Sequence, residues 1–130
     1  MRKLLTPILG IFFGANALWM LVAPLHWYAT IPGVIDTGPA NEHLIRDVGC
    51  AFLVPALALL WFVVNPKRAW PAVLAGAAFL LLHSSIHVWD TLAGREHSHR
   101  FLAEMPTIIL PAFLTLWIGW PQHDASREEP

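Results

Sequence analysis

The sequence predicts an all-α integral membrane protein, a four-helix up-and-down bundle with both termini in the cytoplasm. Hydrophobic residues make up 56% of the 130 residues and charged residues only 13%. Soluble domains carry about 25% charged residues, so this chain is too apolar to be one. Four apolar stretches each approach the ~20 residues that a helix needs to cross ~30 Å of hydrocarbon. Lipid offers no water to backbone groups, so we expect each stretch to be helical.

The four helices are expected at about 4–25, 39–64, 69–92 and 101–120, within one domain spanning 1–130. The first stretch is longer than the apolar region of a signal peptide, so it is predicted to be a retained helix. The turn Gly38-Pro39 is expected to start the second helix, because proline is favoured at a first helical position. The turn Asn65-Pro66 separates the second helix from the third.

Basic residues in the short loops predict the orientation. The first side of the membrane, with both termini and the turn before residue 69, carries five of them: Arg2, Lys3, Lys67, Arg68 and Arg127. The other side carries Arg95 and Arg100, besides Arg46 at the membrane edge. The positive-inside rule therefore places both termini in the cytoplasm, in a bacterial inner membrane. The net charge of −1 gives no case for a nucleic-acid partner, and the single Cys50 excludes an intramolecular disulfide.

The third helix carries the motif HSSIHVWD at residues 83–90. Spacings of four and seven residues place His83, His87 and Asp90 on one helical face. Two imidazoles one turn apart can chelate a transition metal, and a nearby carboxylate can complete the ligand set or orient one imidazole. Ser84 and Ser85 are expected to bond to helical carbonyls or to the neighbouring helix.

Further ionisable residues are predicted at the same end of the bundle. The full set of predicted metal ligands is His43, His83, His87, Asp47, Asp90 and Glu104. Ionisable groups are costly in hydrocarbon unless they pair, bind something or face water, so they are candidates for a functional site. The bound group is expected to be Cu, Zn or Fe, or a b-type haem held between histidines of two helices. Glu104 has the alternative role of stabilising a helix start.

Arg46 and Asn41 are predicted to bind a cofactor at the start of the second helix. Arg46 is a poor metal ligand, and it can grip an anionic or carbonyl-bearing group. Its alternative is a structural pair with Asp47, Asp90 or Glu104. Asp47 is then a counter-ion and not a metal ligand.

The loop and the start of the second helix together contain the pattern PGVxxTGPxNxHxxRDxG, from Pro32 to Gly49. This pattern resembles a signature of uncharacterised small four-helix bacterial inner-membrane proteins. The resemblance covers about 18 of the 130 residues. It implies the same topology, and it implies no substrate.

Three interpretations of the polar cluster remain open at this stage. The first is a metal or haem site facing the periplasm, for redox chemistry or metal handling. The second is a structural accessory subunit whose polar cluster only locks the helices and whose Trp-rich faces pack in a homo-oligomer or a larger membrane complex. The third is a proton or small-molecule site. Whether the protein is an enzyme is left open, although GxSxG, GxGxxG, HExxH and phosphate-loop motifs are absent from the sequence.

Overall fold

A computed structural model describes residues 1–95, 102 and 104–121 of the chain. All regular secondary structure within these residues is helical. In chain order the elements are α1 (Arg2–Val22), α2 (Pro24–Thr30), the 3-10 turn η1 (Val34–Thr37), α3 (Glu42–Val64), α4 (Pro66–Leu92), the π-helical turn η2 (Met105–Ile109) and α6 (Leu110–Gly119).

Three of these helices, α1, α3 and α4, are long and apolar enough to cross a membrane. This agrees with the first three predicted spans and indicates a membrane protein. The segment Met105–Gly119, formed by η2 and α6, is apolar but shorter. The predicted fourth span began at residue 101, and residues 101 and 103 lie outside the described part of the chain.

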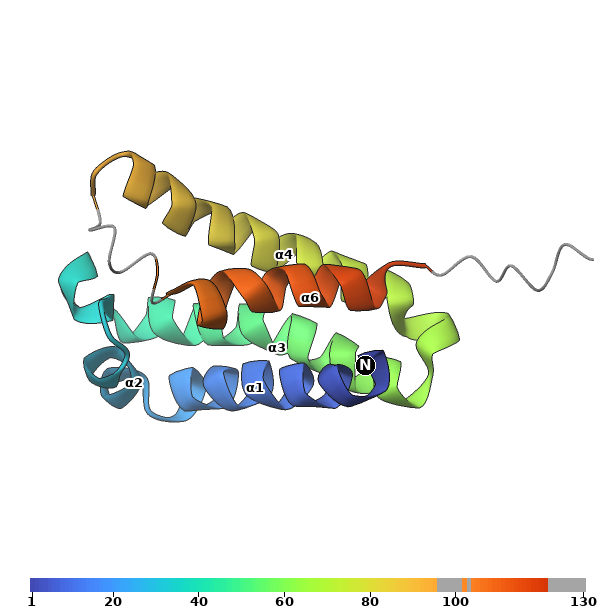
Figure 1. Ribbon diagram of the computed structural model, residues 1–130. Coiled ribbons are helices and arrows are strands. Elements are labelled where there is room, and N and C mark those ends of the chain that lie inside the picture. Colours follow the sequence, from blue (N-terminus) through green and yellow to red (C-terminus); the bar gives the residue numbers. More distant parts are fainter. Residues whose placement is uncertain (96–101, 103, 122–130) are drawn as a thin grey trace, which may run out of the picture.

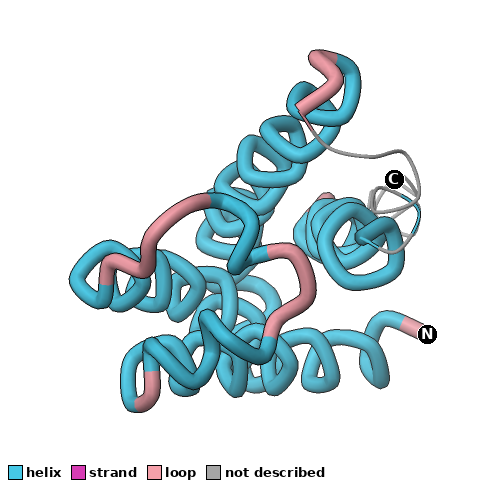
Figure 2. Tube along the Cα trace, turned by 90° about the vertical axis from the view of Figure 1, so that its left-hand side faces the viewer, coloured by secondary structure: helices cyan, strands magenta, loops and turns pink. Residues whose placement is uncertain are grey.

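The long helices pack alongside one another, and the C-terminal part of α4 tilts away from the others toward its end (Figure 1 and Figure 2). α1 packs on α3, α3 on α4, and α4 on α6, with a smaller contact between α1 and α6. The start of α1, the turn between α3 and α4, and the end of α6 share one end of the molecule. α2, η1 and the end of α4 lie at the opposite end, which Figure 2 shows face-on. We call this opposite end, which also carries Glu104, the mouth.

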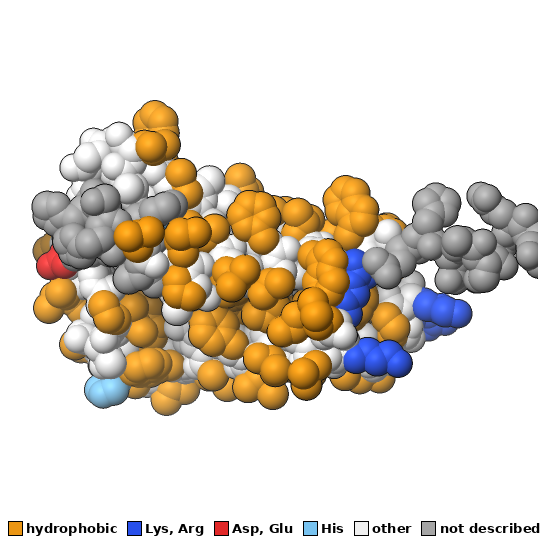
Figure 3. Space-filling model, in the orientation of Figure 1, with side chains coloured by type: hydrophobic (Ala, Val, Ile, Leu, Met, Phe, Trp, Pro, Cys, Tyr) orange, Lys and Arg blue, Asp and Glu red, His pale blue; other side chains and the backbone are white. Residues whose placement is uncertain are grey.

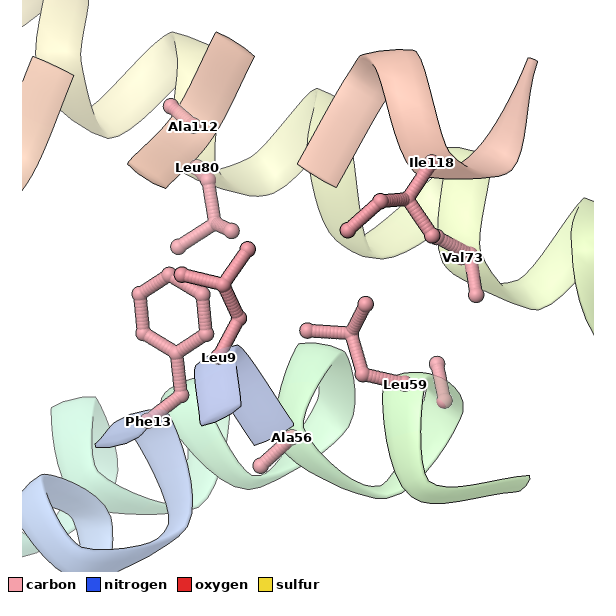
Figure 4. Packing of buried hydrophobic residues seen from close by; sticks show 9 residues of the cluster. Leu9, Phe13, Ala56, Leu59, Val73, Leu80, Ala112 and Ile118 are labelled. Carbon is pink, nitrogen blue, oxygen red and sulfur yellow. The ribbon is translucent and has the colours of Figure 1, made fainter. Parts of the chain in front are cut away.

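Buried apolar side chains from all four packed helices form the core (Figure 4). Leu59, Val73 and Ile118 are completely or almost completely buried there. The outer surface is apolar as well: Figure 3 shows hydrophobic side chains over the middle of one face and Lys or Arg side chains at the end with the N-terminus. A polypeptide that is apolar inside and outside, with charge at its ends, is suited to a bilayer.

Prolines move the helix boundaries away from the predicted ones. The first helix ends at Val22 and not at residue 25, because Pro24 forces Ala23 out of the helical region (φ −136°, ψ 62°). The second begins at Glu42 and not at residue 39. Its N-cap is Asn41, whose side-chain oxygen accepts a hydrogen bond from the Leu44 N–H at 3.1 Å.

The third helix begins at Pro66, three residues before the predicted start at 69. Proline fits the first turn of a helix because the N–H that it lacks would have no partner there. The fourth predicted helix contains the π turn η2 before α6. The Leu110 N–H donates to the Met105 carbonyl, five residues back. Pro111 has no N–H for the Thr107 carbonyl, so the α-helical ladder is interrupted at this point.

The short helix α2 docks on the end of α1 through its aromatic residues. The Trp27 indole N–H donates to the Asn16 side-chain oxygen at 2.9 Å, and the Trp19 indole N–H donates to His26 Nδ1 at 3.0 Å. These bonds give the polar Asn16 of a membrane helix a partner. They also hold α2 against α1, and so they position the segment that continues from α2 at the mouth.

Arg2 joins α1 to the end of α6. Its guanidinium donates to the carbonyl oxygens of Trp117 and Trp120 and lies over the Trp117 ring, 4.7 Å from its centroid. The last carbonyls of a helix have no partner within it and carry the negative end of the helix dipole. Arg2 therefore acts as a C-terminal cap for α6.

Candidate functional site

The candidate site is built on α4 near the mouth. His83 and His87 lie one turn apart, with ring centroids separated by 5.0 Å and ring planes at 73°. The predicted placement of both imidazoles on one face is confirmed. Two imidazoles one helical turn apart can bind the same ion when their side-chain rotamers direct one nitrogen of each ring toward it.

Glu104 completes the site from the segment before η2. Its Oε2 atom lies 3.0 Å from His87 Nδ1, and the side chains of His87 and Glu104 are only 23% and 14% exposed. When Nδ1 carries the proton and donates to the carboxylate, Nε2 keeps a free lone pair. Metal-binding imidazoles are commonly held by a carboxylate that accepts a hydrogen bond from the other ring nitrogen in this way.

His83 lies deeper, among aromatic rings. Phe52 of α3 contacts it edge-on at 5.4 Å between centroids, and Phe79 stacks nearly parallel at 6.1 Å. Within the part of the chain that the structure describes, no hydrogen bond to its ring nitrogens is found. An imidazole is costly in an apolar membrane helix without a partner, so this ring has an unused capacity to bind something.

The remaining predicted ligands lie in other local pairs. Asp90 forms an ion pair with Arg95 at 2.9 Å, although it follows His87 on α4. His43 and Asp47 pair with each other at 3.5 Å on α3, with side chains 90% and 59% exposed. Among the described residues, neither pair makes a ring contact or a hydrogen bond with His83, the deeper of the two α4 imidazoles.

The two predicted cofactor-binding residues have structural partners. Asn41 caps α3 as described above. Arg46 pairs with Glu42, one turn earlier on the same helix, at 3.1 Å, and its Nε lies 3.4 Å from the Leu21 carbonyl oxygen. The expected pairing of Arg46 with Asp47, Asp90 or Glu104 is therefore replaced by a pair with Glu42, the acidic residue nearest to it in helical spacing.

Sequence analysis missed the aromatic neighbours of His83 and the partner of Glu104. Phe79 could have been found, because it lies one helical turn before His83. Phe52 and the pairing of Glu104 with His87 depend on how separate helices pack, which has no local signal. The expectation for the serines is confirmed: the Ser84 hydroxyl bonds to the Leu80 and Ile108 carbonyls, and the Ser85 hydroxyl bonds to the Leu82 carbonyl.

Among the described residues, no group of three or more His, Cys, Asp and Glu side chains is gathered around one possible metal position. The arrangement is two imidazoles with one orienting carboxylate. Such a pair leaves most coordination positions of a metal ion for water or another ligand.

Comparisons of this chain with protein-family models, with curated proteins and with solved structures give no match.

Proposed function

We propose that this is a bacterial inner-membrane protein of four helices, with both termini in the cytoplasm, that binds a transition metal ion near the periplasmic face. His83 and His87 are the ligands, and Glu104 orients His87. The observation that carries the proposal is the combination of an imidazole pair one turn apart with a carboxylate 3.0 Å from Nδ1 of one ring. Of the six predicted ligands, the proposal therefore keeps two as direct ligands and one as the residue that orients His87.

The site favours a metal ion over a haem. A haem held between two helices needs imidazoles that approach the iron from opposite faces. His83 and His87 belong to the same helix, and within the described residues the neighbours that face them from other elements are Phe52 and Glu104. Zn, Cu and Fe all accept imidazole nitrogen, and the open positions suit metal handling or redox chemistry.

A structural role is the second candidate, and one observation favours it. His87 and Glu104 satisfy each other at 3.0 Å, so the pair could serve only to hold the last helix against α4. Among the described residues, the ring nitrogens of His83 have no hydrogen-bond partner, and a purely structural cluster would leave that ring without one, which argues against this role. The two candidates predict different metal contents.

Elemental analysis of the protein purified in mild detergent after metal-replete expression tests the proposal. We expect one metal ion per chain, removed by a chelator with a loss of thermal stability. His83→Ala and His87→Ala should abolish binding. Glu104→Gln should weaken binding by about 10- to 100-fold without abolishing it, which is the usual effect of losing an orienting partner.

Two control variants define the limits of the site. His26→Ala removes an exposed histidine that is bonded to Trp19, and it should leave the metal content unchanged. His43→Ala should also leave the metal content unchanged. A loss of metal in this variant would mean that His43 belongs to the ligand set, as the sequence predicted. Wild-type protein that is metal-free and colourless, with stability insensitive to chelator, would overturn the proposal in favour of the structural role.

A further inference from the structure

A second contact between α4 and the last helical segment lies one turn away from the His87 and Glu104 pair. Ser84 is buried, with 5% of its surface exposed. Its hydroxyl lies 2.8 Å from the Leu80 carbonyl oxygen and 3.3 Å from the Ile108 carbonyl oxygen, so its single proton is shared between the two acceptors. Ser84 precedes His87 by three residues, and Ile108 follows Glu104 by four. The Ser84–Ile108 and His87–Glu104 contacts therefore form one row along the interface between α4 and the segment that contains Glu104 and η2.

The π turn η2 keeps the residues of this row on one side of their segment. Glu104, Ile108 and Ala112 are four residues apart. At 3.6 residues per turn, each step of four residues in an α-helix exceeds a full turn by about 40°, so two steps drift by about 80°. The i→i+5 bonding of a π turn widens the turn, and residues four apart come closer to alignment.

The partners of these three residues agree with that alignment. Ala112 is fully buried in the same cluster as Leu80 of α4 (Figure 4). Ile108 contacts Ser84 of α4 and Glu104 contacts His87 of α4. An unbroken α-helix running back from Ala112 would rotate Glu104 away from α4 by most of a quarter turn.

We propose that Ser84 and the π turn Met105–Ile109 are positioning elements that hold the Glu104 carboxylate against His87 Nδ1. Ser84 donates to the carbonyl oxygen of Ile108, a residue of the π turn. This anchors the turn on α4, and the turn aims Glu104. The metal-binding consequence rests on the proposed function, but the geometric claim about Glu104 and His87 does not.

The test uses the full-length protein in detergent with three serine variants. Ser84→Ala removes the contact and Ser84→Thr keeps a hydroxyl. Ser85→Ala is the matched control, because Ser85 is exposed and, in the described part of the chain, bonds only to Leu82 of its own helix. We expect Ser84→Ala to weaken Zn²⁺ binding by about tenfold, and Ser84→Thr and Ser85→Ala to bind like wild type. Rescue by threonine would show that the effect depends on the hydroxyl group at this position.

A second measurement does not depend on metal. The imidazole nitrogens of His87, followed by NMR of ¹⁵N-histidine-labelled metal-free protein, report whether Nδ1 donates to a carboxylate. Ser84→Ala should move the His87 signals toward those of Glu104→Gln, and Ser85→Ala should not. Ser84→Ala with unchanged His87 signals would overturn the positioning role. Wild-type protein without Zn²⁺ affinity, but with the His87 change in Ser84→Ala, would overturn only the proposed function.

Discussion

Arg46 and Glu104 are both ionisable residues of apolar helices, yet their surroundings differ. The side chain of Arg46 is 47% exposed and pairs with Glu42 across one turn of α3. The side chain of Glu104 is 14% exposed and pairs across two elements with His87. An exposed pair within one helix adds little to stability, whereas breaking a half-buried pair leaves its partner unsatisfied.

The two residues should therefore respond differently to substitution by leucine. We expect Arg46→Leu to change the free energy of unfolding by less than about 1 kcal/mol. Glu104→Leu leaves His87 Nδ1 without its partner and should cost about 1–3 kcal/mol. Thermal unfolding of metal-free protein in detergent measures both. A larger loss for Arg46→Leu than for Glu104→Leu would contradict the partners assigned to the two side chains.

At the site, the sequence predicted what depends on local spacing. His83 and His87 share a face because four residues make about one turn of helix. Asp90 was predicted to join them by the same rule, but Arg95 is close enough along the chain to take its carboxylate. The pairing of Glu104 with His87 required the relative position of α4 and η2, which no spacing rule contains.

The closest approach of two helices at a glycine is that of α3 and α4 at Gly76. A Cβ atom on Gly76 would lie 2.9 Å from the Pro55 Cα atom, which is backbone and cannot rotate away. Gly14 of α1 has more room, because its nearest neighbour would be the Ala56 Cβ atom at 3.8 Å. Small residues at helix contacts in membranes allow such close packing.

The two glycines form a matched pair of alanine substitutions. Gly76→Ala should separate α3 from α4 and destabilise the protein by about 1–3 kcal/mol. Gly14→Ala adds a methyl group in ordinary van der Waals contact with Ala56 and replaces a poor helix former, so it should be neutral or stabilising by up to about 1 kcal/mol. Unfolding in detergent compares them. Equal stability of the two variants would mean that the helices at Gly76 adjust without cost.

Helix boundaries were the least predictable property of the elements. The prolines that set them are visible in the sequence, and Pro66 begins α4 as a proline at a first turn does. Pro24, however, was expected inside the first helix and starts a separate one, α2. The π turn could not be predicted, because an interrupted ladder can also kink or end a helix, and packing on α4 selects among these outcomes.

Charged side chains gather at the two ends of the helix bundle. The Lys and Arg side chains visible in Figure 3 lie at the end with the N-terminus, and the mouth carries acidic and His side chains together with Arg46 and Arg95. The helical class and three membrane-length helices follow from composition and hydropathy alone, and the structure confirms both. The fourth span, the orientation and the resemblance to small inner-membrane proteins stay predictions.

Cysteine labelling tests the orientation in a Cys50→Ser background, since Cys50 is a free and exposed thiol. Thr30→Cys lies on α2 at the mouth, and Ser126→Cys lies in the tail outside the described residues. Because five basic residues flank the predicted cytoplasmic side, an impermeant maleimide added to intact cells should label Thr30→Cys and not Ser126→Cys. Labelling of Ser126→Cys before cell lysis would reverse the orientation.

The cap that Arg2 places on α6 also constrains the order of assembly. Arg2 and the Trp120 carbonyl are separated by 118 positions in the sequence, so the cap is a non-local contact that the chain can make only once α6 has been synthesised. Until the cap forms, the last turn of α6 has carbonyl groups without partners, in or near a solvent that cannot hydrate them. The Arg2 cap therefore favours the closed arrangement, in which the end of α6 is docked beside the start of α1, over any arrangement in which α6 is detached.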